Sequence, residues 1–424
     1  MSNDTNELFR AEAASRALPE WLQARSSEAL DEFLRHGFPQ KTLENWRYTD
    51  LRPMAARAEA FLSEAPQNVT EASEIYTDPD NLTLVFRDGQ PDTAASHTDA
   101  PGLSVRLLPE ALDEDLSDYL NTTAASNLSG LNLALMDCGA VIDIAADTVM
   151  ERPLHIVFDN VSEGTRYPRL LIRAGKNSAA TVVEHHTGNA AGNTIAVTDI
   201  HCDAGANLRY QKVQEEAPDA YHVACQILQL KRDSRCDVLN VDLGAAIARN
   251  DLRIHLQGQG AHASATGFFL VDGKRHTDNH LHLAHEAPHA SSNAHYAGVM
   301  ADKGRGVFNG MIHVYKDAQK TDAALYNKNL LLTPGAEINT KPELEIYADD
   351  VKCAHGSTTG QLDTTALFYL RARGIPEAQA RNMLIQSFAA EVFQHIATDG
   401  LRQHIQQAVE TRLNELGAAI EDGI

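Results

Sequence analysis

Apolar residues recur at helical spacing mainly near the two ends of the chain. Two such runs lie near the N-terminus, over residues 8–13 and 21–34, and the second follows a proline and stops at a glycine. Three more lie near the C-terminus, over residues 364–373, 376–396 and 401–416. The predicted apolar stripes of the last two consist of Leu384, Phe388, Val392 and Ile396, and of Leu401, Ile405, Val409, Leu413 and Leu416. Proline at the start and glycine at the end are common boundaries of helices. We therefore expect amphipathic helices in both end segments.

The middle of the chain, from about residue 80 to residue 363, has a different pattern. Short runs rich in β-branched residues are separated by Gly, Asn and Asp, and helical spacing is nearly absent. Such runs are typical of β-strands. The clearest predicted strands are residues 82–86, 141–144, 154–158, 170–173, 181–184, 194–200, 208–213, 223–230, 237–243 and 252–256.

A weak repeat runs through this β-rich region. Small or polar breaks occur at Ser178, Gly205, Ser234 and Gly260, which are 27, 29 and 26 residues apart, and a strand-like run follows each break. A repeat of this length in an all-β region favours stacked coils, because one coil alone cannot bury its apolar face. A β-sandwich, which also has regular turns, is the alternative.

A cysteine and a histidine, Cys353 and His355, lie two residues apart near the end of the β-rich region. They follow residues 344–347, whose alternation of apolar and polar side chains predicts a strand. If the strand continues, both side chains point to the same face. Thiolate and imidazole both bind iron and zinc, but two ligands do not complete a site. The alternative is a buried cysteine beside a hydrogen-bonded histidine.

Composition excludes several classes of protein. The formal charge of −22 argues against nucleic acid as a partner, since phosphate binding requires clustered Lys and Arg. The chain has no run of 18 apolar residues and its first ten residues are polar, so we expect no membrane span, no export signal and a cytoplasmic location. The five cysteines are widely spaced, which indicates reduced thiols rather than a disulfide framework.

Nine histidines lie between His255 and His313, and six of them fall between His276 and His295. Because imidazole is a common metal ligand, this cluster is a second candidate for metal binding. The spacing matches no known zinc motif, so hydrogen-bonded or solvated histidines are the alternative. Residues 44–51, which contain Trp46, are interpreted as an aromatic anchor that packs the N-terminal helices on the next domain.

Nucleotide-binding and hydrolase motifs are absent from the sequence. The segment from Gly267 to Lys274 comes nearest to a phosphate-binding loop, but it has five residues between its glycines and Arg275 where Ser or Thr should bind magnesium. The chain also lacks the Gly-x-Ser-x-Gly turn of hydrolases. We therefore predict that this chain binds no nucleotide and does not hydrolyse ATP, and hydrolase and dinucleotide-dependent activities lose support.

Four segments of the C-terminal half resemble the SufB/SufD family, which scaffolds the assembly of iron–sulfur clusters. They are residues 306–324, 327–332, 342–356 (PELEIYADDVKCAHG) and 367–374, and the match runs nearly unbroken over residues 302–391. Within the family the chain resembles the SufD branch, because residues 44–51 are similar to a SufD signature and the cysteine-rich N-terminal motif of many SufB proteins is lacking.

The resemblance implies a mainly β fold, a right-handed parallel β-helix flanked by helical domains. The expected domains are an N-terminal helical domain (1–80), the β-helix (81–360) and a C-terminal helical domain (361–424). The resemblance also implies that the chain pairs with SufB and binds the ATPase SufC through its C-terminal helices. An exposed last coil of the β-helix would also allow a homodimer when SufB is absent.

For the site, the resemblance implies that His355 faces SufB as a ligand or supporting group of a transient iron–sulfur cluster. Cys353 is a second candidate ligand, and SufB would complete the set. Two functions from other classes remain open at this point: a β-helix enzyme acting on polysaccharide, and an autonomous metal-binding protein using the histidines. The residues implied in SufC binding are Leu367, Phe368, Tyr369, Leu370, Arg371, Arg373 and Gly374.

Overall fold

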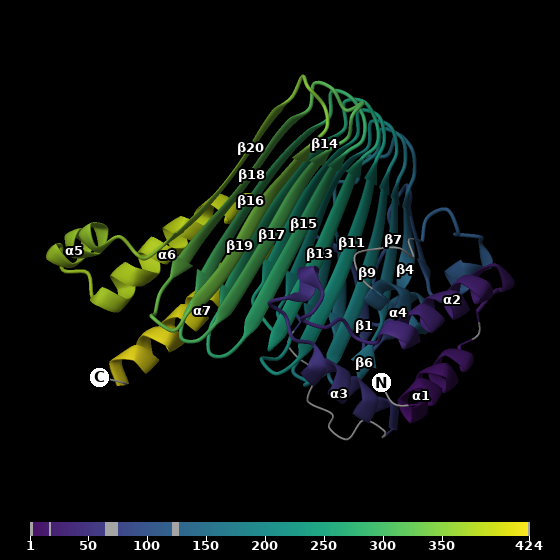
Figure 1. Ribbon diagram of the computed structural model, residues 1–424, viewed down its shortest axis with the longest axis horizontal. Helices are drawn as coiled ribbons and strands as arrows, with labels where there is room; N and C mark the ends of the chain where they lie inside the picture. The colour runs from purple at the N-terminus through teal and green to yellow at the C-terminus, as the bar shows by residue number, and fades with distance from the viewer. Residues whose placement is uncertain (1–2, 17, 64–74, 121–126, 423–424) are drawn as a thin grey trace.

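The computed structural model describes residues 3–16, 18–63, 75–120 and 127–422. Figure 1 shows two long sheets wound together as a parallel β-helix, with helices against each end. The fold is therefore mainly β, and the stacked coils expected from the repeat are confirmed. No helix in the described part of the chain is both long and apolar enough to cross a membrane.

Each coil of the β-helix contributes one strand to each sheet. In the first sheet the order is β2-β1-β5-β8-β10-β12-β14-β16-β18-β20. Its strands are β1 (Leu82–Arg87), β2 (Gln90–Pro91), β5 (Leu154–Asp159), β8 (Ala179–Thr187), β10 (Asn207–Gln214), β12 (Arg235–Asp242), β14 (His262–Val271), β16 (Ser291–Met300), β18 (Asp322–Leu331) and β20 (Lys352–Gly360).

The second sheet has the order β19-β17-β15-β13-β11-β9-β7-β4-β3, with β6 pairing beside β9. Its strands are β3 (Leu103–Leu107), β4 (Cys138–Ile144), β6 (Thr165–Arg166), β7 (Pro168–Ala174), β9 (Asn193–Cys202), β11 (Tyr221–Leu230), β13 (Ile247–Leu256), β15 (His276–His285), β17 (Arg305–Val314) and β19 (Glu337–Ile346). All ten predicted strands fall on these elements.

The predicted repeat corresponds to the rise of one coil. Asn207 is in register with Arg235, and Arg235 is in register with His262, so the first sheet advances by 28 and 27 residues at these steps. The breaks at residues 178, 205, 234 and 260 lie just before β8, β10, β12 and β14. They mark the turns at which the chain enters each new coil of the first sheet.

Inward-facing side chains form stacks along the axis of the β-helix. One stack runs through Val182, Tyr210, Val238 and Ala265, which are in register on β8, β10, β12 and β14 and are all buried. The buried carboxylate of Glu184 is hydrogen-bonded within the interior: it accepts from Tyr210 Oη at 2.6 Å and from Thr198 Oγ1 at 2.7 Å. The coils therefore share one continuous core, as a solenoid requires.

The N-terminal helices cover one side of the first coils. They are α1 (Asn3–Ala14), α2 (Glu20–His36) and α3 (Arg52–Ser63), and a further helix, α4 (Asn127–Leu135), lies beside them. Leu128 and Leu131 of α4 and Phe33 of α2 share a cluster with Ile195 and Val223 of the second sheet. The sequence pattern does not predict α4, since eight of its nine residues from Leu128 onward are buried and no amphipathic alternation remains.

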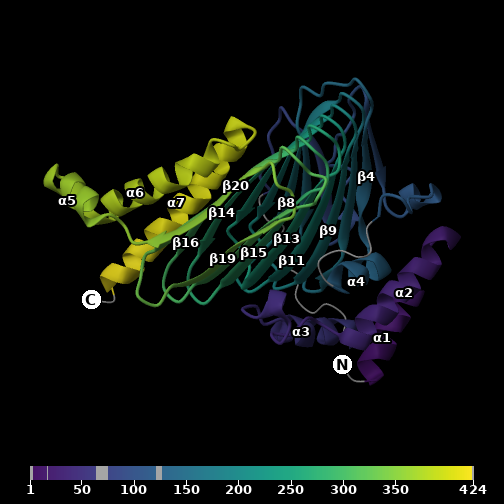
Figure 2. The same cartoon turned by 45° about the horizontal axis from the view of Figure 1, so that its top comes forward.

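The C-terminal helices α5 (Thr364–Ala372), α6 (Glu377–Phe393) and α7 (Asp399–Asp422) extend from the last coils, and α6 and α7 lie along the first sheet (Figure 2). The buried face of α6 is made of Ile385, Ala389, Val392 and Phe393, whereas Leu384 and Phe388 are half-buried. The stripe predicted for this helix is thus displaced by one residue at two positions. On α7 the predicted residues Leu401, Ile405, Val409 and Leu413 are buried as expected.

Candidate functional site

The last coil leaves both sheets open. Strand β19 pairs with β17 and strand β20 pairs with β18, and each stands at the end of its sheet. In the described part of the chain no strand pairs with their outer edges. Their backbone N–H and C=O groups therefore form two free edges, which are templates for adding a strand from another chain.

Cys353 and His355 lie on β20, in register with Ala323 and Leu325 of β18. Ala323 and Leu325 are core residues, so Cys353 and His355 occupy the positions that face the interior of the β-helix. No further coil covers them, and His355 is exposed while Cys353 is half-buried against the end of the core. The prediction that the two residues share one face of a strand agrees with this placement.

The chemical environment of Cys353 and His355 differs. Burial, together with the nearby carboxylate of Asp322, raises the pKa of the Cys353 thiol, so the thiol stays protonated at neutral pH without a metal. His355 presents its imidazole to solvent and to any chain that docks on the open end. A cluster or metal would therefore meet His355 first.

Exposed aromatic and aliphatic side chains surround the open end. Tyr347, Tyr326 and Ile346 are 62%, 46% and 40% exposed. Surface aromatic residues beside a free strand edge are typical of protein interfaces, where they supply much of the contact energy. The alternating pattern places Ile346 and Tyr347 in a predicted strand, but it does not reveal that their side chains are exposed, because exposure depends on the absence of a covering strand.

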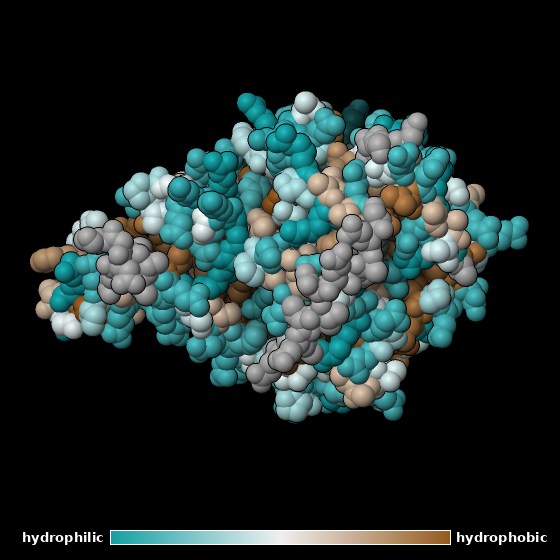
Figure 3. All heavy atoms as spheres, turned by 90° about the horizontal axis from the view of Figure 1, so that it is seen from below, coloured by the Kyte–Doolittle hydropathy of each residue, from teal (hydrophilic) through white to brown (hydrophobic). Residues whose placement is uncertain are grey.

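Helix α5 is exposed on almost every side. None of its residues is buried, and Phe368 and Tyr369 are 72% and 57% exposed. Its N-terminus is capped by Asp363, whose carboxylate accepts hydrogen bonds from the backbone of Thr365 and Ala366. Apolar side chains also reach the surface at this end of the molecule in Figure 3. A capped helix with unpacked aromatic side chains is suited to binding a partner.

The histidines between His255 and His313 do not converge on one site. His280 lies 3.1 Å from Asp278, His285 accepts or donates a hydrogen bond with Ser292 Oγ at 2.8 Å, and His295 lies on the other sheet, 3.8 Å from Glu391. Among the described residues, two groups of three side chains could hold a metal ion, and neither group contains any of these histidines. His280, His285 and His295 therefore have separate partners within the chain, whereas the ring of His282 lies between those of His255 and His313, with centres 6.4 and 6.2 Å apart.

Residues 44–51 dock on the outer face of the second sheet. Trp46 is 3% exposed, and the guanidinium of Arg249 lies 3.8 Å from the centre of its ring. Arg249 also donates to Asn45 O at 2.8 Å, and Lys341 of β19 pairs with Glu44 at 3.0 Å. The interpretation of this stretch as an aromatic anchor is supported, and the anchor reaches as far as the last coil.

Two groups with metal-binding side chains were missed by the sequence analysis. They are His185–Glu215–His404 and His186–Glu216–His222. The members of each group come from separate elements, and the two glutamates lie in the loop after β10, so spacing alone does not reveal the groups. The one local signal is that His185–His186 and Glu215–Glu216 are adjacent pairs one coil apart.

The fold and the open end define a class of protein: a parallel β-helix whose last coil carries Cys353 and His355 and is not covered by a further strand in the described part of the chain, with an exposed helix beside it. Residues 157–388 match the family model described as the SufBD core domain of the SUF system for iron–sulfur cluster assembly. This segment is more than half of the chain. The chain therefore belongs to the SufBD family.

Known relatives extend the match over nearly the whole chain. The chain is 30% identical to the iron–sulfur cluster assembly protein SufD of Escherichia coli over 425 residues, which cover 96% of each protein. It is 31% identical to a SufBD family protein of Synechocystis over 395 residues, 88% of this chain and 87% of that protein. It is 25% identical to the chloroplastic protein ABCI7 of Arabidopsis thaliana over 417 residues, 93% of this chain and 86% of that protein. The predicted likeness to the SufD branch is confirmed.

Proposed function

We propose that this chain is a non-enzymatic scaffold subunit that pairs with a SufB protein through the open end of its β-helix and presents His355 to a transient iron–sulfur cluster. The observation that carries the proposal is the position of His355: it occupies a core-facing position on the last strand, yet it is exposed because no further coil follows. A second β-helix docked on this end would enclose it.

The ligand count supports a site shared between two chains. An iron–sulfur cluster generally takes four protein ligands, and the open end supplies one histidine and one cysteine. In this proposal SufB provides the remaining thiolates or carboxylates. The raised pKa of the Cys353 thiol makes it the less available of the two residues, so His355 is the principal ligand and Cys353 a supporting one.

The ATPase SufC docks in this proposal on the C-terminal helices. The support is the exposure of Phe368 and Tyr369 on α5 and the attachment of α6 to the first sheet through Phe393, whose ring lies 4.9 Å from that of Phe268. A rigid link between the docking helix and the sheet would transmit movement of SufC to the open end. Nucleotide chemistry would then belong to the partner.

Co-purification tests the pairing and the docking separately. The chain, SufB and SufC are co-expressed with an affinity tag on SufB. We expect all three to be recovered together, and we expect Phe368→Asp to keep SufB but to lower the amount of SufC recovered. The matched control is Val149→Asp at the first coils, where the side chain is 70% exposed. Recovery of SufB without this chain would refute the proposal.

A further inference from the structure

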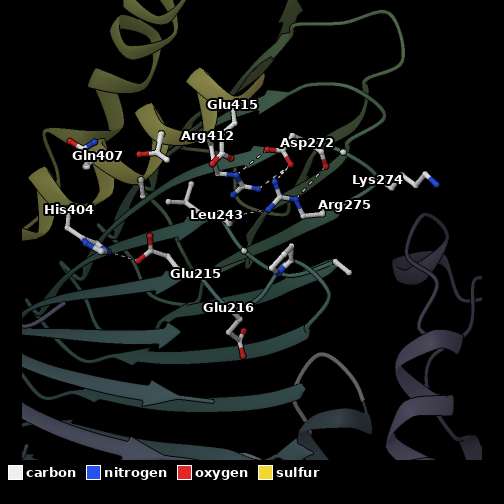
Figure 4. Close-up of a pocket in the computed structure, with 16 residues that line it drawn as sticks. Glu215, Glu216, Leu243, Asp272, Lys274, Arg275, His404, Gln407, Arg412 and Glu415 are labelled. Carbon is white, nitrogen blue, oxygen red and sulfur yellow. Dashed lines mark hydrogen bonds and ion pairs between the residues drawn. The ribbon is translucent and has the colours of Figure 1, made fainter. Parts of the chain in front are cut away.

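A buried group of two histidines and one glutamate joins α7 to the β-helix. His185 lies near the end of β8, Glu215 follows β10, and His404 lies in the second turn of α7. Figure 4 shows the side chain of His404 directed at Glu215, whereas the side chain of Glu216, which follows Glu215 in the sequence, points away from His404. Three segments, up to 219 residues apart in sequence (404 minus 185), thus meet at one carboxylate.

The distances place all potential ligand atoms together. His185 Nε2 lies 2.9 Å from Glu215 Oε2, and His404 Nε2 lies 2.7 Å from the same oxygen. The side chains of His185, Glu215 and His404 are 2%, 15% and 31% exposed. The potential ligand atoms of the three residues all lie within 4.8 Å of one another, as the binding of a single ion requires.

A neighbouring histidine fixes the orientation of His185. His155 Nε2 lies 3.3 Å from His185 Nδ1, and the two rings are stacked with centres 5.4 Å apart. Metal-binding histidines usually make a hydrogen bond through the ring nitrogen that does not contact the metal. The contact between His155 Nε2 and His185 Nδ1 is of this kind. It fixes the plane of the His185 ring and directs its Nε2 atom at Glu215.

The group is open to solvent on one side. Glu215 and His404 line a cavity of about 820 Å³ between α7 and the coils that contain Leu243 and Asp272. A metal ion and the water molecules that complete its coordination could enter from this cavity. The other group, His186–Glu216–His222, is fully buried, and Glu216 already accepts from Asn160 and Thr194.

We propose that His185, Glu215 and His404 bind one divalent transition-metal ion of the Zn²⁺ or Fe²⁺ type, each through one atom, with water completing the coordination. Two imidazoles and one carboxylate suit ions of this class, and the three ligands leave an open position. The ion replaces the protons on the two Nε2 atoms that otherwise donate to Glu215. This site is separate from the open end and does not depend on the proposed pairing with SufB.

A metal ion bound at this site would connect α7 to the β-helix. Other contacts hold the same helix: Leu401, Ile405 and Val409 are buried against the first sheet, and Arg412 pairs with Asp272 at 3.1 Å. Helix α7 therefore stays folded when His404 is replaced. This makes a His404 variant an informative test, whereas replacement of the fully buried His185 carries a risk of misfolding.

The experiment uses the full, untagged, reduced chain with Cys353→Ser and His355→Ala, so that the open end cannot bind metal. Zn²⁺ binding is measured by competition with a chromogenic chelator, and Co²⁺ is added as a spectroscopic probe. We expect one tight Zn²⁺ per chain and Co²⁺ absorption typical of nitrogen and oxygen ligands without a thiolate band. In His404→Gln we expect affinity to fall by about a hundredfold or more, while far-UV circular dichroism stays unchanged.

The matched control is His395→Gln, since His395 is an exposed histidine close to α7 but outside the group. It should bind Zn²⁺ as tightly as the parent. The proposal is overturned if the parent binds no Zn²⁺, if His404→Gln binds as tightly as the parent, or if the Co²⁺ spectrum shows a thiolate ligand.

Discussion

The two ends of the β-helix are built differently. In the first coil, β1 and β4 are almost entirely buried, and short antiparallel strands, β2 and β3, end the two sheets. In the last coil, β19 and β20 have no buried residue, although their inward positions continue the stacks of the core. One end is closed by the chain itself. At the other end the strands keep the register of the core, but their side chains are exposed like those of a surface. This difference indicates that the last coil is built to be covered by another chain.

The largest contrast should appear when the same charge is placed at each end. Ile142→Asp on β4 buries a carboxylate at a fully buried position and should lower the free energy of unfolding by about 4 kcal/mol or more. Thr359→Asp on exposed β20 should change it by less than about 0.5 kcal/mol. Urea denaturation of the isolated chain measures both. Equal losses would contradict the view that the last coil is a surface.

The buried histidine His285 inside the β-helix should also make the stability of the protein sensitive to acid. Burial lowers the pKa of His285 from 6.5 to about 4. Between these values the unfolded chain binds more protons at this residue than the folded chain, so stability is lost as the pH falls from about 6.5 to about 4. The loss from this residue is on the order of 3 kcal/mol.

Replacement of this histidine should flatten the pH profile. His285→Gln keeps a partner for Ser292 but cannot take up a proton, so its stability should fall less steeply than that of the wild type below pH 6.5. The two profiles should run parallel above pH 6.5. Thermal unfolding at a series of pH values tests this, and identical slopes below pH 6.5 would show that His285 does not contribute.

At the open end, substitutions should affect pairing rather than stability. Tyr347→Glu places a charge on an exposed aromatic side chain and should weaken binding to SufB about tenfold or more, with stability unchanged within about 0.5 kcal/mol. Val149→Glu is the matched control, because Val149 is 70% exposed but lies at the first coils. Surface plasmon resonance with immobilised SufB would distinguish them, and equal weakening by both variants would argue against the open end as the interface.

The smallest structural effect is expected from His355→Ala. The side chain is exposed in the isolated chain, so folding and pairing should be unaffected. The iron bound to the assembled complex should fall by about tenfold or more if His355 is a ligand, and Cys353→Ser should cause a smaller loss. Iron analysis of anaerobically reconstituted complexes measures this. An unchanged iron content in His355→Ala would remove His355 from the ligand set.

The sequence pattern predicts the strands and the coil repeat of the β-helix well, because both depend on residues that are close together in the chain. Breaks such as Gly205 recur once per coil, and strand runs such as residues 223–230 are marked by apolar side chains over a few consecutive positions. Helix α4 escaped prediction because it is buried nearly all round. The stripe on α6 was displaced because α6 packs with Ile385 and Ala389 inward, a choice set by the facing sheet.

The candidate site was only partly accessible to sequence reasoning. Cys353 and His355 are close in sequence, so their shared face could be inferred from strand geometry alone. Their exposure could not, because it depends on which coil is the last. The group around Glu215 could not be found either, since the coil repeat brings His185 near it and the packing of α7 adds His404.

The most direct test of the open end as the SufB interface is site-specific crosslinking. A photoreactive phenylalanine analogue is placed at position 347 beside β19 or, as the matched control, at position 106 in β3 of the first coil, and each chain is assembled with SufB. The account predicts crosslinks to SufB from position 347 and none from position 106. Crosslinks from position 106 alone would contradict it and would place SufB at the closed end.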